Sequence, residues 1–90
     1  MACKILKQVS LAGFKETGNT KHYHGNVKLP KPEALQLIKY DGDDGYYLFY
    51  LNENMEEMTD TYHNTIERAF QQAEWEFDIQ AKDWKEVSSE

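Results

Sequence analysis

A run of six apolar and aromatic residues, 46–51 (YYLFYL), constrains the fold more than any other feature of the chain. The glycines and aspartates of residues 41–45 (DGDDG) precede it, and residues 52–54 (NEN) begin a second turn after it. Aromatic runs bounded by Gly, Asp and Asn are typical of strands joined by tight hairpins. Both faces of the run are apolar, which predicts either a central strand covered on both sides or one whose tyrosines serve an outer surface.

Three further segments fit strands of the same sheet. Apolar and polar residues alternate in residues 5–11, and residues 34–40 and 57–62 have the composition and flanking turns of hairpin-connected strands. Residues 12–32 differ, because glycine, asparagine and proline punctuate them and few apolar residues interrupt. We expect a long loop there, with a short extended piece around residues 21–24. Loops longer than ~12–15 residues are uncommon in compact domains and are often functional.

A helix is predicted over residues 65–77. Asn64 followed by Glu67 fits a capping box, and apolar residues recur at helical spacing along one side. Residues 79–87 are expected to fold back onto the core through Ile79, Trp84 and Val87. The expected core comprises Ile5, Val9, Leu48, Tyr50, Ile66, Ala69, Phe70, Ala73 and Phe77. The predicted fold is α+β, with a three- to four-stranded, mostly antiparallel sheet packed on one main C-terminal helix.

Length and composition indicate one small domain over residues 1–90. Hydrophobic residues make up 40% of the chain and aromatic residues 13%, too many for a disordered chain although 29% are charged. One cysteine, Cys3, cannot form an internal disulfide and favours a reducing compartment. No apolar run reaches the ~20 residues that span a bilayer. Lys4 and Lys7 stand where a signal peptide would be apolar, so we expect a cytoplasmic protein without membrane contact.

His22 and His24 would place two imidazoles on one side of an extended segment, a spacing that many metal sites use. His63 is a third ligand if the fold brings it near. No cysteine or carboxylate completes a recognised pattern around the pair, so ordinary loop histidines are the simpler interpretation. We therefore expect no metal or other cofactor. The alternative is a housekeeping protein that binds a metal or a small molecule through the histidines of the 12–32 loop.

The acidic turn does not fit a calcium loop. Counting from Asp41 puts Gly45 at position 5, where an EF-hand needs an oxygen ligand, and Tyr46 at position 6, where it needs glycine. Catalytic patterns are also missing. No serine lies in a G-x-S-x-G context, Cys3 has no neighbouring base, and the turn glycines sit among acids that repel phosphate. We predict that the protein is not an enzyme.

The charge of the chain is sharply segregated. Residues 1–40 contain seven lysines and two glutamates, a balance of +5, whereas residues 41–90 contain three basic residues and fourteen carboxylates, a balance of −11. Such a distribution steers association with a basic partner and opposes binding of nucleic acid by the acidic half. The simpler interpretation is that these acids only keep the protein soluble. The sequence leaves the oligomeric state open.

The functional interpretation is a carboxylate-rich docking surface for a basic protein. Tyr47 and other exposed aromatic residues would supply the anchoring contact, because tyrosine and tryptophan are enriched at binding hot spots. Nucleic acid is an unlikely partner, since surfaces that stack on bases pair aromatics with positive charge. The acidic residues expected to steer the encounter are Asp41, Asp43, Asp44, Glu67, Glu74 and Asp78.

Three stretches together resemble a group of small uncharacterised bacterial proteins, namely residues 40–48 (YDGDDGYYL), 59–63 (TDTYH) and 72–77 (QAEWEF). The resemblance covers about half of the chain, residues 40–84, and brings no activity with it. It implies a bacterial or phage origin and a stand-alone domain. Small acidic bacterial proteins include toxin-immunity proteins and phage-encoded inhibitors of host defence. This analogy of size and charge favours an inhibitor that occupies a partner's surface.

Overall fold

A computed structural model gives the fold and describes residues 3–18 and 23–87. The central sheet has the strand order β6-β5-β4-β1-β7, and every neighbouring pair in it is antiparallel. The elements in chain order are β1 (Cys3–Ser10), β2 (Tyr23–His24), β3 (Val27–Lys28), β4 (Ala34–Tyr40), β5 (Tyr46–Leu51), β6 (Glu57–His63), α1 (Ile66–Phe77), a 3₁₀ turn (Ala81–Asp83) and β7 (Lys85–Glu86). The predicted α+β fold is confirmed. The sheet gains a fifth strand because the short β7 pairs with β1.

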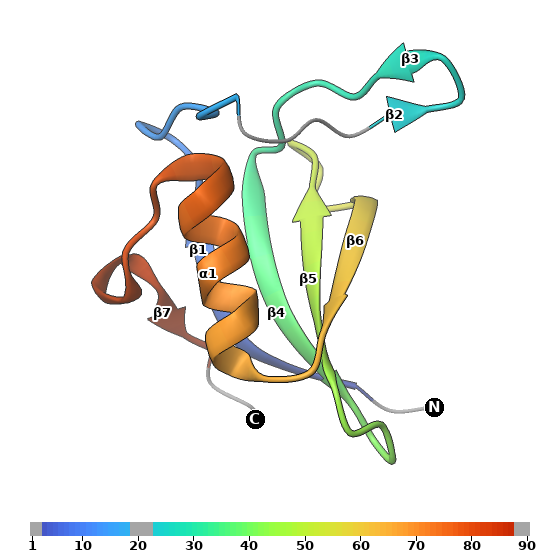
Figure 1. Ribbon diagram of the computed structural model, residues 1–90, viewed down its shortest axis with the longest axis vertical. Helices are drawn as coiled ribbons and strands as arrows, with labels where there is room; N and C mark the ends of the chain where they lie inside the picture. The colour runs from blue at the N-terminus through green and yellow to red at the C-terminus, as the bar shows by residue number, and fades with distance from the viewer. Residues whose placement is uncertain (1–2, 19–22, 88–90) are drawn as a thin grey trace.

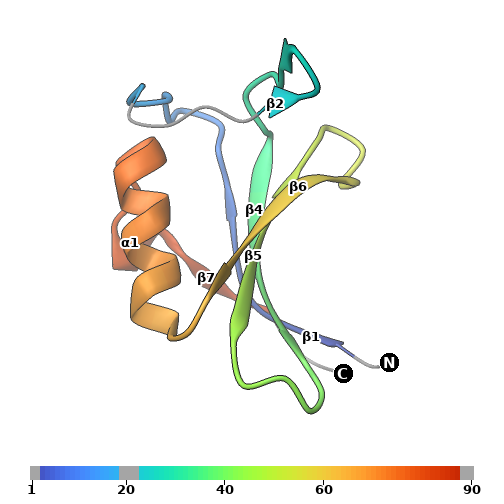
Figure 2. The same ribbon diagram turned by 45° about the vertical axis from the view of Figure 1, so that its right-hand side comes forward.

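Helix α1 lies across one face of the sheet, as Figures 1 and 2 show from two directions. We call this side the helix face and the other side the open face. In an antiparallel sheet, residues paired across strands share a face, so the register assigns every paired strand residue to one of the two. Among the residues that the structure describes, no helix is long and apolar enough to span a membrane.

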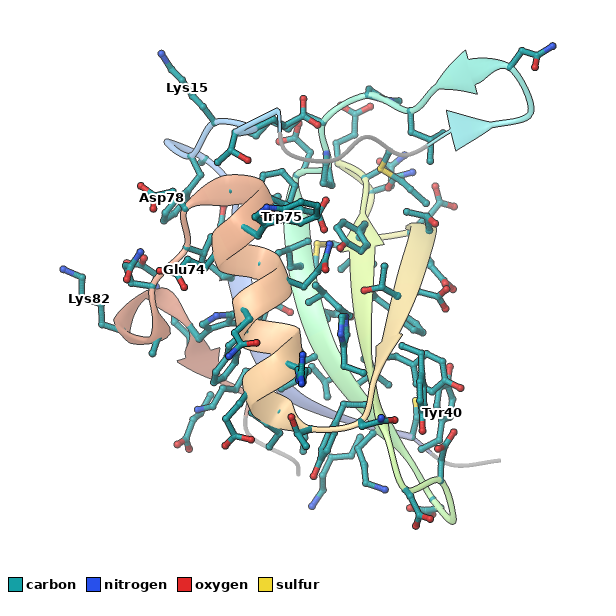
Figure 3. All side chains as sticks on the ribbon, in the orientation of Figure 1. Lys15, Tyr40, Glu74, Trp75, Asp78 and Lys82 are labelled. Atoms are coloured by element: carbon teal, nitrogen blue, oxygen red, sulfur yellow. The ribbon has the colours of Figure 1, made fainter. Side chains whose placement is uncertain are left out.

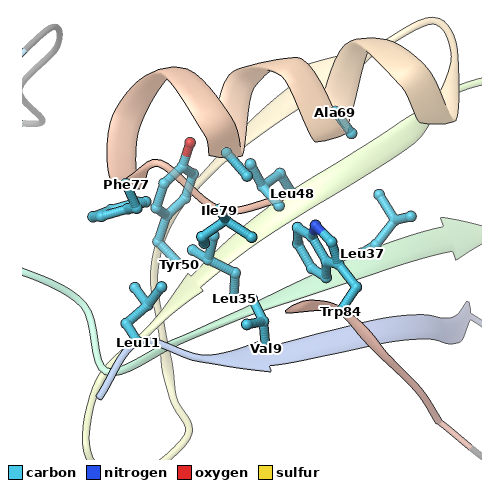
Figure 4. Close-up of a cluster of buried hydrophobic side chains, with 11 residues drawn as sticks. Val9, Leu11, Leu35, Leu37, Leu48, Tyr50, Ala69, Phe77, Ile79 and Trp84 are labelled. Carbon is cyan, nitrogen blue, oxygen red and sulfur yellow. The ribbon is translucent and has the colours of Figure 1, made fainter. Parts of the chain in front are cut away.

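The hydrophobic core fills the space between α1 and the helix face (Figure 4). Six of the nine expected core residues are buried there, and Ile66 and Phe70 pack against the cluster while remaining partly exposed. Ile79 and Trp84 fold back onto the core as predicted. Trp84 stacks on Phe70 with ring centroids 5.3 Å apart. The buried cluster comprises Val9, Leu11, Leu35, Leu37, Leu48, Tyr50, Ala69, Ala73, Phe77, Ile79 and Trp84.

The placement of Ile5 in this core was wrong, and a β-bulge is the reason. The register of β1 against β4 shifts between Ile5 and Lys7. Without the shift, Ile5 and Val9 would share a face, since side chains alternate with period two. With it, Val9 pairs with Leu35 on the helix face, whereas Ile5 pairs with Ile38 on the open face. The bulge thus moves one large apolar side chain to the open face.

The helix begins one residue later than the predicted capping box requires. Thr65, not Asn64, is the N-cap, and its hydroxyl accepts a hydrogen bond of 3.1 Å from the backbone amide of Arg68. Glu67 then lies in the first turn, where its negative charge interacts favourably with the helix dipole. The helix ends at Asp78, which adopts the left-handed conformation (φ 59°) and whose amide donates to the carbonyl of Glu74.

The expected 12–32 loop contains a small hairpin. Strands β2 and β3 pair in it as a separate two-stranded sheet, which Figure 1 shows projecting beyond the end of the main sheet. The ends of the segment are fastened to the domain: the amide of Leu11 donates to the carbonyl of Glu33 at 2.9 Å, and Lys31 Nζ donates to the carbonyl of Leu11 at 3.0 Å. The extended piece predicted at residues 21–24 includes β2, and its first two residues lie outside the described part of the chain.

Candidate functional site: the aromatic face

Four aromatic rings form one cluster on the open face. Tyr47 and Tyr62 pair across β5 and β6 with ring centroids 5.1 Å apart and planes at 68°. Tyr40 meets Tyr47 edge-on at 5.3 Å, and Phe49 lies 6.5 Å from both Tyr40 and Tyr47. Edge-to-face contacts of this kind match the charge distribution of aromatic rings. We call Tyr40, Tyr47, Phe49 and Tyr62 the aromatic face.

The aromatic face is accessible. Tyr62 is 49% exposed, and Tyr40, Tyr47 and Phe49 are each partly exposed. Because β6 is an edge strand, no further strand of the described sheet lies beside Tyr62. Ile5, which is partly exposed, lies further along the open face on β1, whereas its partner Ile38 is buried. Contiguous apolar surface of this kind marks an interaction site more often than single exposed apolar residues do.

Carboxylates border the aromatic face. Asp43 accepts hydrogen bonds from the hydroxyls of Tyr47 at 3.3 Å and Tyr62 at 3.5 Å. Asp60 pairs in register with Phe49, and Glu57 pairs with Leu51, so the open face also holds these two side chains. We call Asp43, Glu57 and Asp60 the acidic rim. None of the open-face positions that the register defines in β1, β4, β5 and β6 is a lysine or arginine.

Burial and the acidic rim both raise the pKa values of the tyrosines on this face. Burial raises the pKa of Tyr47 and of Tyr62, and the charge of Asp43 and its hydrogen bonds raise both further. Burial also raises the pKa of Glu57, and the neighbouring Asp60 adds to this through a hydrogen bond and its charge. The phenols are thus harder to ionise than ordinary tyrosines, and the carboxylates repel one another. A cation placed among them would relieve that repulsion.

Lys39 lies beside the β4–β5 turn, but its side chain belongs to the helix face. Its Nζ donates to the backbone carbonyl of Asp43 and lies 5.7 Å from the ring centre of Tyr46, which belongs to the helix face. Because the side chain is held there, its charge does not sit among the rings of the open face.

Gly45 sets the position of Tyr62. The Tyr62 ring lies directly over this glycine, and a Cβ added at position 45 would overlap the hydroxyl end of the ring. The amide of Gly45 donates to Asp43 Oδ1 at 3.0 Å, which holds the same carboxylate that Tyr62 reaches. The glycine in the turn is thus needed for space beneath a ring of the aromatic face.

The structure separates the predicted partner-binding residues into groups. Asp41, Asp43 and Asp44 share the β4–β5 turn beside Tyr47, and Glu67 lines a shallow depression with Asp44. Glu74 and Asp78 lie at the other end of α1, where both contact the side-chain amide of Gln80 at 3.4 Å. Figure 3 shows this pair far from Tyr40. The expected single acidic surface is therefore at least two surfaces.

A second polar cluster lies between α1 and the helix face. Glu76 is only 4% exposed, and it accepts hydrogen bonds from the hydroxyl of Tyr50 and from Gln72 Nε2 at 2.7 Å. Burial is the main cause of a strongly raised pKa of Tyr50, and Glu76 raises it further. Sequence reasoning missed Glu76, although its spacing from Ala69 and Ala73 places it on the apolar stripe of the helix.

His63 lies at the edge of this second cluster. Its Nε2 is 2.7 Å from Thr61 Oγ1, and burial lowers its pKa while the charge of Glu76 opposes the shift. A shallow groove of about 280 Å³ opens beside it, lined by His63, Arg68, Gln71, Gln72 and Trp75. The groove offers amides, a cation and a ring, but no pair of groups placed for acid–base chemistry on a bound molecule.

The alternative metal site lies largely outside the described residues. His22 lies outside the described residues, and His24 belongs to β2, of which only the backbone is described. Within residues 3–18 and 23–87, no group of three or more His, Cys, Asp or Glu side chains is arranged to hold a metal ion.

Sequence reasoning named only part of the candidate site. Asp43 and Tyr47 were named because they adjoin the turn, whereas Tyr40, Phe49 and Tyr62 of the ring cluster were not. The signal that could have found Tyr62 is the alternation of residues 57–63, which puts it on the same side as Asp60. The chain matches none of the protein families, curated proteins or solved structures with which it was compared.

Proposed function

We propose that the protein is a binding module that recognises a basic protein partner and acts by occupying part of that partner's surface. One observation carries the proposal: the aromatic face has no helix over it within the described chain, and its border is acidic. Aromatic residues dominate binding hot spots because they bury large areas at little entropic cost. An aromatic surface with charges of one sign fits a partner that is both apolar and basic.

The parts of the surface have separate roles in this proposal. The rings of Tyr47 and Tyr62 form the anchoring contact, and the acidic rim orients the partner around them. Asp41 and Asp44 in the adjoining turn add to the local negative potential. Glu67, Glu74 and Asp78 act at longer range as part of the net charge of −6. The protein needs no reactive group for this role, in the manner of an immunity protein or an inhibitor, because occupation alone blocks the partner.

Nucleic acid fits the same surface poorly. Bases can stack on aromatic rings, but such sites need cations to hold the phosphates. Here Asp43, Glu57 and Asp60 border the rings. Phosphate would meet only like charge at these positions.

The test compares two exposed aromatic residues that belong to different elements. Tyr62 and Trp75 are each 49% exposed, the first on the open face and the second on α1. Proteins captured from a lysate of the native host by the wild type are identified, and binding of the purified candidate is then measured with Tyr62→Ala and Trp75→Ala. We expect the Tyr62 variant to lose at least about tenfold in affinity, the loss typical of a hot-spot residue. The Trp75 variant should bind like the wild type.

The second measurement is the dependence of the association rate on salt concentration. The association rate with the partner should fall as the Debye length shrinks from ~30 Å at 0.01 M to ~8 Å at 0.15 M salt. A partner whose affinity depends on Trp75 and not on Tyr62, or whose association rate ignores salt, would remove the acidic aromatic surface from the function.

A further inference from the structure

We propose that the aromatic face receives an arginine side chain of the partner, with the guanidinium stacked on the ring of Tyr62 between Asp43 and Asp60. This inference rests on the proposed function and names the group that anchors the partner. It follows from the orientation of Tyr62, the position of β6 and the charges at both ends of the ring.

The ring of Tyr62 packs against Tyr47 on one side and is covered by no described strand on the other. Tyr47 meets it at 68° from β5, the only strand of the described sheet that borders β6. No described strand lies on the other side, where Asn64 and Arg68 line a shallow depression with Tyr62, and nearly half of the residue's surface is exposed. A flat cation can approach an aromatic ring from such a side, since the centre of the ring face is negative.

Carboxylates lie at both ends of this ring. The hydroxyl of Tyr62 is 3.5 Å from Asp43 Oδ1. At its base, Asp60 stands two residues earlier on the same strand and face, a spacing of roughly 7 Å in an extended chain. A cation over the ring therefore lies within reach of negative charge in two directions.

The two carboxylates differ in how much bonding capacity they have left. Asp43 already accepts hydrogen bonds from Gly45, Tyr47 and Tyr62. A carboxylate has roughly four acceptor sites, so Asp43 acts mainly as a fixed charge. Asp60 is exposed beside Glu57, whose pKa is raised partly by Asp60. A guanidinium that pairs with Asp60 relieves this repulsion and gains a charge-assisted hydrogen bond.

Arginine suits these features better than lysine does. Its guanidinium is planar, weakly hydrated and able to stack and pair with a carboxylate at once, whereas an ammonium is compact and strongly hydrated.

A second copy of this chain is a poorer occupant. A two-fold interface places the same patch of both copies together. Asp43, Glu57 and Asp60 of one copy would then face the acidic rim of the other, with no lysine or arginine at the open-face positions of β1, β4, β5 and β6 to compensate. Lys85 of β7 pairs with Gln8 on this face, but at the opposite edge of the sheet from the rim on β6.

The experiment uses the full chain and three blocked peptides, Ac-Gly-Arg-Gly-NH₂ and its lysine and citrulline counterparts. Binding is followed by NMR at about 0.02 M salt through the ring and amide signals of Tyr47, Asp60 and Tyr62. We expect the arginine peptide to bind two- to fivefold more tightly than the lysine peptide, which corresponds to ~0.5–1 kcal/mol of exposed cation–π attraction. The citrulline peptide, planar but neutral, should not shift these signals.

Three variants locate the contact. Tyr62→Leu should bring arginine binding down to the lysine level, and Asp60→Asn should weaken both cationic peptides. Trp75→Leu on α1 is the matched control and should change neither. Circular dichroism confirms that each variant is folded. Equal binding of arginine and lysine by the wild type, or shifts confined to the Glu74 and Asp78 end of α1, would overturn the proposal.

A final competition separates this inference from the function on which it rests. If the partner requires Tyr62 but excess arginine peptide does not displace it, the arginine anchor is wrong and the binding function stands. If the partner binds Tyr62→Ala as well as the wild type, the proposed function itself fails.

Discussion

Replacing Tyr50 by phenylalanine tests the buried contact between α1 and the sheet. The substitution keeps the ring, which packs 6.5 Å from that of Phe77, and removes only the hydroxyl that donates to Glu76. Glu76 is 4% exposed and keeps Gln72 as a donor. A hydrogen bond to a charged group contributes ~1.5–3 kcal/mol to stability, and the acceptor left behind is buried. We therefore expect Tyr50→Phe to lower the free energy of unfolding by about 1.5–3 kcal/mol.

Urea denaturation at pH 7 and 25 °C measures this loss, with an unchanged m-value as the sign that the unfolded state is unaffected. Tyr46→Phe is the control, because Tyr46 lies on the same strand and face and has no hydrogen bond to Glu76 in the structure. It should shift stability by less than about 0.5 kcal/mol.

A double-mutant cycle then isolates the pair. Glu76→Gln keeps the size of the side chain and removes its charge, so the effect of Tyr50→Phe should shrink in that background by at least ~0.5 kcal/mol. Strictly additive effects of the two substitutions, or a cost of Tyr50→Phe no larger than that of the Tyr46 control, would show that the hydroxyl and the carboxylate do not stabilise one another.

Three shorter predictions test other parts of the fold. Phe77→Ala should lower the free energy of unfolding, measured with urea, by ~3–5 kcal/mol because Phe77 is 1% exposed. Phe70→Ala should lower it clearly less, since that ring is only partly buried. Equal losses would contradict the placement of Phe70 at the edge of the core. Burial lowers the pKa of His63 from 6.5, so below that pH the unfolded chain binds a proton more readily than the folded chain does. The free energy of unfolding should therefore fall as the pH drops through about 6.5. If the pH dependence of stability is the same in His63→Gln, the assignment to His63 is wrong. Gly45→Ala should move Tyr62 off the turn, visible as altered ring shifts in NMR and reduced arginine-peptide binding, while spectra identical to the wild type would mean that the ring does not need that space.

Local signals were enough to predict most of the fold. Two patterns can be read from residues close together in sequence: the turn-bounded run at residues 46–51 and the apolar stripe of α1. Both elements lie where they were expected. The fifth strand was missed because β7 has only two residues, Lys85–Glu86, which become a strand only by pairing with β1. The bulge after Ile5 was missed for a similar reason, since it is a property of the pairing with β4.

The residues of the candidate site were harder to predict, because strand pairing brings them together. Tyr47 was expected to anchor a partner from its place beside the acidic turn, but its ring neighbours come from β4 and β6. Only the register shows that Tyr62 stands opposite Tyr47 and that Asp60 stands opposite Phe49. Helical spacing could not show on which side of the sheet α1 would lie, and so could not separate Glu74 and Asp78 from the acidic turn.

This separation of the acidic residues predicts different kinetic effects for the two ends of the molecule. Charges that do not touch the partner act through the field and change the association rate, whereas charges in the contact also change the dissociation rate. Reversal of Glu74 and Asp78 to lysine should therefore slow association at low salt and leave dissociation of the partner unchanged. Asp60→Lys should slow association and also speed dissociation. Surface plasmon resonance at 0.01 M and 0.15 M salt measures both rates, and faster dissociation from the Glu74 and Asp78 variant would place the contact on α1 instead of the aromatic face.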